Sequence, residues 1–223
     1  MRFTSHRDFS RAFERAVLRA QLPVAYSSGF NPHPRISYAG ASPTGAASEA
    51  EYLEIALAQI VDPAAVQAQL DEVMPAGLDI VDVVTSPGGA LADMLTASRW
   101  VIDIPLEQSA AATSVEAFLA AESVLVQRMT KRGLREFDCR AAVLALTVDA
   151  LPSESGQAGS RLALTLRHVE PAVRPDDVMT GLRAVGGLDL GSAAPLLTRL
   201  EQGPLDEATA TIGDPLHADV NRI

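Results

Sequence analysis

The spacing of apolar residues switches repeatedly between helical periodicity and alternation, in segments too short for an all-helical chain. Ser5 is a candidate N-cap, and Pro23 disfavours helical angles at the residue before it, so we predict a helix ending near Gln21. Its apolar stripe consists of Phe9, Phe13, Ala16, Val17 and Ala20. By contrast, Glu51–Leu57 alternates polar and apolar residues, which is typical of a half-buried strand.

The order of such segments predicts an α+β fold. Strands are predicted over residues 24–26, 35–39, 51–57, 78–84, 100–105, 124–129, 134–139, 143–150 and 161–168, and helices over 5–21, 63–73, 114–122 and 175–185. Two β-α-β-β-α-β units, the second with an extra hairpin, explain this order better than a parallel doubly wound sheet. We therefore expect ferredoxin-like halves over residues 1–88 and 94–205, each an antiparallel sheet with helices on one face. Residues 206–223 lack a periodic apolar pattern and are expected to form a loose tail.

The beginning of the chain leaves little room for a first strand. Only Met1–Thr4 precede the Ser5 cap, whereas strands usually run for about 5–6 residues. We expect this strand to be truncated. The alternative is that the strand was lost and that the C-terminal tail covers the gap.

Cysteine and histidine usage limits the cofactors that this chain can hold. Cys139 is the only cysteine, so the chain alone forms neither a disulfide nor the thiolate cluster that an iron–sulfur centre needs. His6, His33, His168 and His217 are scattered singly, which disfavours a zinc site. No phosphate-binding glycine motif, membrane span or secretory signal is present, so we expect a cytoplasmic protein without a cofactor of its own.

The charge is unevenly distributed along an acidic chain whose net charge is −10. Residues 1–40 carry six Lys and Arg against two Asp and Glu, and residues 128–140 carry five against two. The candidate anion contacts are Arg7, Arg11, Arg15, Arg19, Lys131 and Arg132. These basic islands are either ordinary solvated surface or a local contact with RNA or another anion, and the net charge argues against DNA as a partner.

The most informative stretch is Tyr26-Ser27-Ser28-Gly29-Phe30-Asn31-Pro32-His33-Pro34-Arg35-Ile36-Ser37. Pro32 and Pro34 lack backbone donors and push the residues before them away from helical angles, which predicts a stiff extended segment on a sheet edge or rim. Asn31, His33 and Arg35 then face a partner. In the competing interpretation, the prolines only bend a strand while Phe30 fills the core.

This stretch, together with Ser5-His6-Arg7-Asp8 and Ser48-Glu49-Ala50-Glu51-Tyr52-Leu53-Glu54, resembles a family of unknown function linked to radical S-adenosylmethionine (radical SAM) enzymes. The resemblance is closest over residues 2–57 and continues more loosely towards residue 200. Family members are encoded beside radical SAM proteins or fused to their C-terminus. The resemblance therefore implies a partner that carries an iron–sulfur cluster, S-adenosylmethionine and, in many cases, cobalamin. Arg7 and Ala41-Ser42 depart from the family pattern. Family members also begin with an additional strand and a turn, so the resemblance implies that roughly ten residues of the protein are missing upstream.

The resemblance implies no catalytic residues, because the family has no established reaction. The preferred interpretation is an accessory or substrate-positioning module for a radical SAM enzyme. The alternatives are an RNA-binding factor in RNA modification or ribosome maturation, and an enzyme acting alone through His6 and His33. The candidate binding surface comprises Ser5, His6, Asp8, Gly29, Phe30, Asn31, His33, Arg35, Ser48, Glu49 and Glu51.

Overall fold

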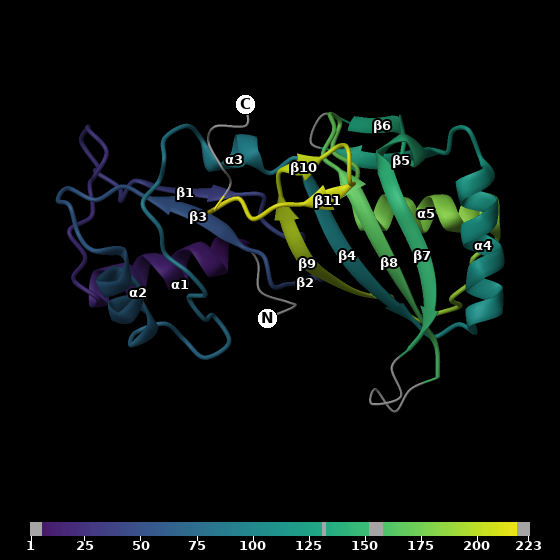
Figure 1. Ribbon diagram of the computed structural model, residues 1–223, viewed down its shortest axis with the longest axis horizontal. Coiled ribbons are helices and arrows are strands. Elements are labelled where there is room, and N and C mark those ends of the chain that lie inside the picture. The colour runs from purple at the N-terminus through teal and green to yellow at the C-terminus, as the bar shows by residue number, and fades with distance from the viewer. Residues whose placement is uncertain (1–5, 131–132, 152–157, 218–223) are drawn as a thin grey trace. The chain divides into compact units, whose positions relative to one another are not determined.

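The computed structural model describes residues 6–130, 133–151 and 158–217. The chain folds into two compact units, residues 1–94 with 215–223 and residues 95–214 (Figure 1). Both units contain helices and antiparallel strands, so the predicted α+β class is confirmed. The expected truncated strand falls on residues 1–4, which lie outside the described residues.

The N-terminal unit packs one amphipathic helix against a small antiparallel sheet. Helix α1 (His6–Arg19) buries Phe13, Ala16 and Val17, as its stripe predicts. Strands β1 (Ile36–Ala39) and β3 (Tyr52–Ile55) pair with Ile36 opposite Ile55. The remaining elements of this unit are β2 (Ala47–Ser48), α2 (Pro63–Asp71) and α3 (Leu91–Met94). The core cluster contains Phe13, Val17, Leu22, Val24, Val66 and Leu70, with Leu53, Ile55 and Leu57 packed against it.

Residues 78–84 form no strand, which corrects the sequence expectation for this segment. Side chains of α2 take the place of a strand partner. The Gln67 amide donates to the carbonyl oxygens of Ile80 and Val81 at 3.0 and 3.1 Å, and the Ile80 amide donates to Asp71. These bonds satisfy the backbone of an extended segment without a sheet ladder.

The C-terminal unit has a ferredoxin-like topology. Its main strands are β4 (Ala97–Ile104), β7 (Val143–Ala150), β8 (Ser160–Arg167) and β9 (Leu196–Gly203), in the spatial order β9-β4-β8-β7. Every neighbouring pair is antiparallel. Helix α4 (Gln108–Ala120) follows the first of these strands and α5 (Pro175–Gly186) precedes the last, which gives the β-α-β-β-α-β order.

The helices of this unit cover one face of the sheet (Figure 1). Strand β8 shows the two faces clearly, because Leu162, Leu164 and Leu166 are fully buried while their neighbours along the strand are half-buried. Ion pairs join strands on the other face, including a bidentate pair between Arg161 and Asp103 at 2.6 and 2.8 Å.

The extra hairpin in the second unit is present as predicted. Strands β5 (Leu125–Thr130) and β6 (Gly133–Asp138) pair between α4 and a 3-10 turn, η1 (Arg140–Ala142). The Arg128 guanidinium attaches the hairpin to α5 by pairing with Asp177, and it also lies 4.8 Å from the centre of the Phe137 ring.

The expected loose tail over 206–223 is wrong for its first part. Strands β10 (Leu205–Asp206) and β11 (Thr211–Ile212) form a short hairpin, and Glu207 pairs with Arg167 at 2.7 Å. The spacing of apolar residues could not predict these strands, because a strand of two residues is too short to show a period. Residues 218–223 lie outside the described part of the chain.

Candidate functional site

The Gly29–Arg35 stretch forms the tip of a narrow loop. Tyr26 bridges Pro34, and the Ser27 amide donates to the carbonyl oxygen of His33 at 2.9 Å. In return, the His33 amide donates to Oγ of Ser27 at 3.0 Å. The loop, defined here as the GFNPHP loop (residues 26–35), is therefore closed at its base by two hydrogen bonds.

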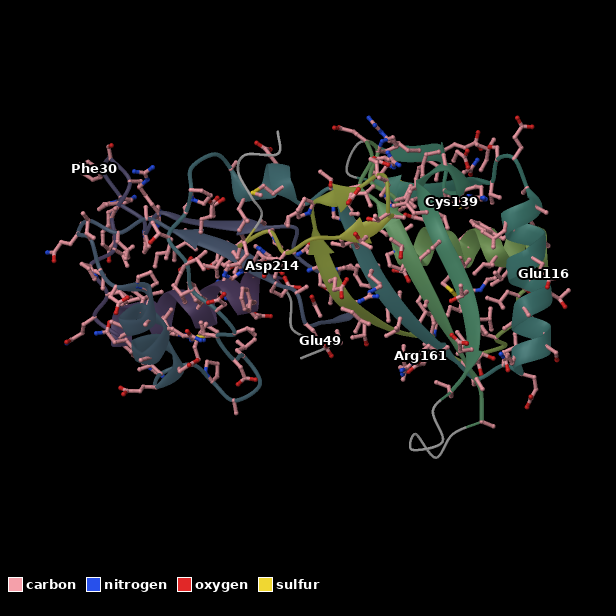
Figure 2. The ribbon with its side chains drawn as sticks, in the orientation of Figure 1. Phe30, Glu49, Glu116, Cys139, Arg161 and Asp214 are labelled. Carbon is pink, nitrogen blue, oxygen red and sulfur yellow. The ribbon has the colours of Figure 1, made fainter. Side chains whose placement is uncertain are left out.

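Phe30 lies at the tip of the GFNPHP loop, where it is fully exposed and packs against no other residue in the part of the chain that the structure describes. Its side chain is 102% exposed, and Figure 2 shows it projecting from the loop. The interpretation in which Phe30 fills the core is wrong, since Phe13 and its neighbours occupy that position. Gly29 has φ +132°, a backbone conformation that favours glycine, so the turn leading into Phe30 depends on this residue.

The polar residues of the loop are exposed as well. Asn31, His33 and Arg35 all face solvent, and their contact with a partner stays a prediction. Tyr26, the first residue of the stretch that the sequence singled out, is 49% exposed at the base of the loop.

His6 and Asp8 belong to a different part of the unit. The His6 ring meets Tyr38 edge-on at 5.2 Å between centroids, and Tyr38 also contacts Phe9 and Phe13. Burial raises the pKa of Tyr38, whose hydroxyl donates to the Ser10 carbonyl oxygen at 3.4 Å. Asp8 is exposed on α1, and Ser5 lies outside the described residues. The contacts of the three α1 rings with Tyr38 hold α1 on β1.

In the third candidate segment, residues 48–54, polar side chains accept hydrogen bonds from nearby backbone amides. Oγ of Ser48 accepts from the Ala50 amide at 3.3 Å, and a Glu51 carboxylate oxygen accepts from the Ser42 amide at 3.4 Å. Glu49 is exposed, and Figure 2 labels it. Within residues 6–130, 133–151 and 158–217, no group of three or more His, Cys, Asp or Glu side chains is arranged to hold a metal ion.

The four arginines of α1 form one continuous exposed row, defined here as the arginine row. It consists of Arg7, Arg11, Arg15 and Arg19, all exposed. Leu18, which the sequence did not indicate as a surface residue, is 59% exposed on the same side of the helix. Lys131 and Arg132 lie outside the described residues, so their relation to the row stays a prediction.

A chain of hydrogen bonds that runs from the buried residues Trp100 and Ser98 to His168, in the C-terminal unit, was not predicted from the sequence. The Trp100 indole donates to Oγ of Ser98 at 2.9 Å, and that oxygen lies 3.0 Å from Nε2 of His168. Nδ1 of His168 lies 2.6 Å from the carbonyl oxygen of Leu95, so this nitrogen carries the proton and the Ser98 hydroxyl donates to Nε2. The chain is internally satisfied, which is typical of a structural element.

The fold and these surfaces define an α+β protein with a ferredoxin-like C-terminal unit and an exposed aromatic loop on its N-terminal unit. No helix within the described residues is both long and apolar enough to cross a membrane. The chain belongs to a family described as an uncharacterized protein conserved in bacteria (DUF2344), which matches residues 1–175. A search of curated proteins gave no match.

Proposed function

We propose that this protein is a cytoplasmic accessory module that binds a radical SAM enzyme, positions its substrate, or does both. Phe30 is the observation that carries the proposal. Its ring is 102% exposed at the tip of a closed loop. Burying such a ring contributes roughly 1.5–3 kcal/mol. A partner that covers Phe30 therefore gains this free energy of burial, because the ring is not buried in the isolated chain.

The closed base of the GFNPHP loop supports binding by limiting its entropic cost. Two prolines fix backbone angles within the loop, and the bonds between Ser27 and His33 hold its two strands together. A loop that is already ordered loses little conformational freedom when it binds, and this preorganisation raises affinity.

The charge of the loop indicates the kind of surface that it fits. Residues 20–48 contain no Asp or Glu, and His33 and Arg35 follow Phe30 in the same loop. The complementary surface is an apolar pocket for a phenyl ring with carboxylates at its rim, where Arg35 can form charge-assisted hydrogen bonds.

The identity of the partner rests on the resemblance in three sequence segments to the radical-SAM-linked family. A chain with a single cysteine supplies no cluster of its own, so the iron–sulfur cluster and S-adenosylmethionine belong to the partner. In relatives with a cobalamin-binding partner, the cobalamin is likewise on that partner.

RNA binding is the second candidate function and rests on a different surface, the arginine row of α1. A stand-alone enzyme has the least support. The Ser27 hydroxyl accepts the backbone amide of His33 rather than facing its imidazole, and His6 packs on Tyr38.

Co-expression with a radical SAM protein from the same organism tests the proposal. The expected result is a complex that survives affinity purification and gel filtration and is weakened at least tenfold by Phe30→Ala. Ile60→Ala is the matched control, because Ile60 is an equally exposed apolar residue of the same unit, at 105%. Separate migration of the two wild-type proteins, or equal weakening by both variants, contradicts the proposal.

A further inference from the structure

Positive charge in the N-terminal unit is concentrated on one helix. Residues 1–94 contain six Lys and Arg, and four of these form the arginine row. Residues 41–94 contain nine Asp and Glu and no Lys or Arg. The row is therefore a basic strip on an otherwise acidic unit, and Asp8 and Glu14 are the acidic residues of α1 that share its side of the helix.

The arginine row lies on the side of α1 opposite its buried side. Successive residues turn by about 100°, so the four arginines point between roughly 120° and 240° from the direction of the buried Phe13. Consecutive arginines are about 6 Å apart along the axis, and the row is about 18 Å long. Within the described residues, none of the four forms an ion pair with an acidic side chain.

We propose that the arginine row binds the phosphate backbone of single-stranded RNA. Four guanidinium groups at regular intervals present repeated donors to successive phosphates along one strand. Leu18, 59% exposed beside them, gives an apolar surface on which a sugar or base can rest. Binding by this row is electrostatic and independent of base sequence.

The acidic surroundings of the row select a narrow ligand. A double helix or an anionic bilayer is broad, so it covers more of this acidic unit and meets more of its carboxylates, Asp8 and Glu14 of α1 itself among them. A single strand follows the row alone and avoids this repulsion. RNA is the nucleic acid that cells hold largely in single-stranded form, so it is the partner to which this surface is assigned.

The arginine row deepens the second candidate function and does not depend on the GFNPHP loop. The charge-removing variant Arg11→Gln/Arg15→Gln is expected to retain the complex with the radical SAM protein, whereas Phe30→Ala is expected to retain RNA binding. Failure of either proposal is therefore distinguishable from failure of the other.

Fluorescence anisotropy with a labelled 12-nucleotide single-stranded RNA, titrated between 25 and 200 mM KCl, tests the inference. Four phosphate contacts give a slope of log K against log salt of about −3, and the double variant reduces it to about −1.4. If the two proteins have equal affinity at 1 M KCl, these slopes give a loss of affinity on the order of a hundredfold in 25 mM KCl and about tenfold in 200 mM KCl. Arg99→Gln/Arg183→Gln removes the same charge from exposed positions in the C-terminal unit and serves as the control.

The same titration with duplex RNA and with vesicles containing 30% phosphatidylglycerol completes the test. Weaker binding to both than to the single strand supports the inference. The inference is overturned if the control variant loses as much affinity for the single strand as Arg11→Gln/Arg15→Gln does. It is also overturned if duplex RNA binds as tightly as the single strand, or if the double variant weakens binding to vesicles but not to RNA. Thermal melting of each variant shows whether its fold is retained.

Discussion

The backbone amide of His33 donates to Oγ of Ser27 across 3.0 Å, and this bond closes the base of the loop that presents Phe30. It joins two exposed residues six positions apart, so it organises the tip of the loop without support from the core.

Ser27→Ala removes the only acceptor that a side chain offers to this amide among the described residues. We expect the His33 amide to exchange with solvent at least tenfold faster, because its protection comes from this bond. The melting temperature is expected to change by about 1 °C or less, since exposed hydrogen bonds contribute little net stability. Hydrogen exchange measured by NMR checks this, with Ser28→Ala as the control.

Helix packing in the C-terminal unit depends on the absence of a side chain at Gly186. A Cβ at this position would lie 2.7 Å from Cα of Ser114 and would overlap its carbonyl oxygen, so α4 and α5 would have to separate. Gly186→Ala is expected to lower the free energy of unfolding by about 3 kcal/mol. Gly187→Ala meets open space but has φ +64°, so we expect a loss of only about 1 kcal/mol. Urea denaturation of both variants checks that Gly186→Ala lowers the free energy of unfolding more than Gly187→Ala does. Equal losses of stability contradict this prediction.

His168 is expected to make stability depend on pH. Burial lowers its pKa below the usual value of about 6.5, the bond to Leu95 opposes this shift, and the charge of Arg199 adds to it. The unfolded chain therefore binds the proton first. The contribution of neutral His168 is complete above about pH 6.5 and is lost as pH falls towards its folded pKa. Protonation of Nε2 also removes the acceptor for Ser98.

The corresponding measurement is the free energy of unfolding of wild type and His168→Gln at pH 7.5 and pH 5.0. The wild type is expected to lose more stability between these values than the variant does. The same pH dependence in both proteins would show that other groups are responsible.

Cys139 is expected to be chemically inert in the native protein. Burial, assisted by the carboxylates of Asp138 and Asp177, raises the pKa of its thiol to about 12, so almost no thiolate exists near neutral pH. Ellman's reagent should react with less than about 5% of the thiol in the folded protein and with all of it in 6 M guanidinium chloride. Fast reaction of the native protein contradicts the burial of this residue.

Local signals predicted the elements that pack in a regular way. The helix α1, the strand β3 and the strand β7 at Val143–Ala150 are all present. Each of them packs one face against the core of its own unit, which is what gives the sequence its period. The helix predicted over residues 63–73 is present as α2, and Asp62 caps it, with its carboxylate accepting from the Ala64 amide at 3.3 Å.

Elements that depend on distant partners were not predicted correctly. Residues 78–84 have strand-like composition, yet their carbonyls are satisfied by Gln67 of α2. Strand β9 was missed because a register shift opposite Arg99 and Trp100 breaks its alternation and because it buries Arg199 and Gln202. Polar residues at buried positions carry no periodic signal.

The candidate site was predicted in part. The prolines placed the GFNPHP loop at the surface, but the side chain of Phe30 is apolar and composition alone did not decide between core and solvent. His6 and Glu51 were grouped with the loop by motif, whereas the structure uses them to hold α1 and a neighbouring turn.

Site-specific photo-crosslinking from position 30 in cells tests the central claim most directly. Benzoylphenylalanine replaces Phe30 in one strain and Ile60 in another, since both side chains are fully exposed in the same unit. The prediction is a crosslink from position 30, and none from position 60, to a radical SAM protein identified by mass spectrometry. No crosslink from position 30, or the same products from both positions, would contradict the account.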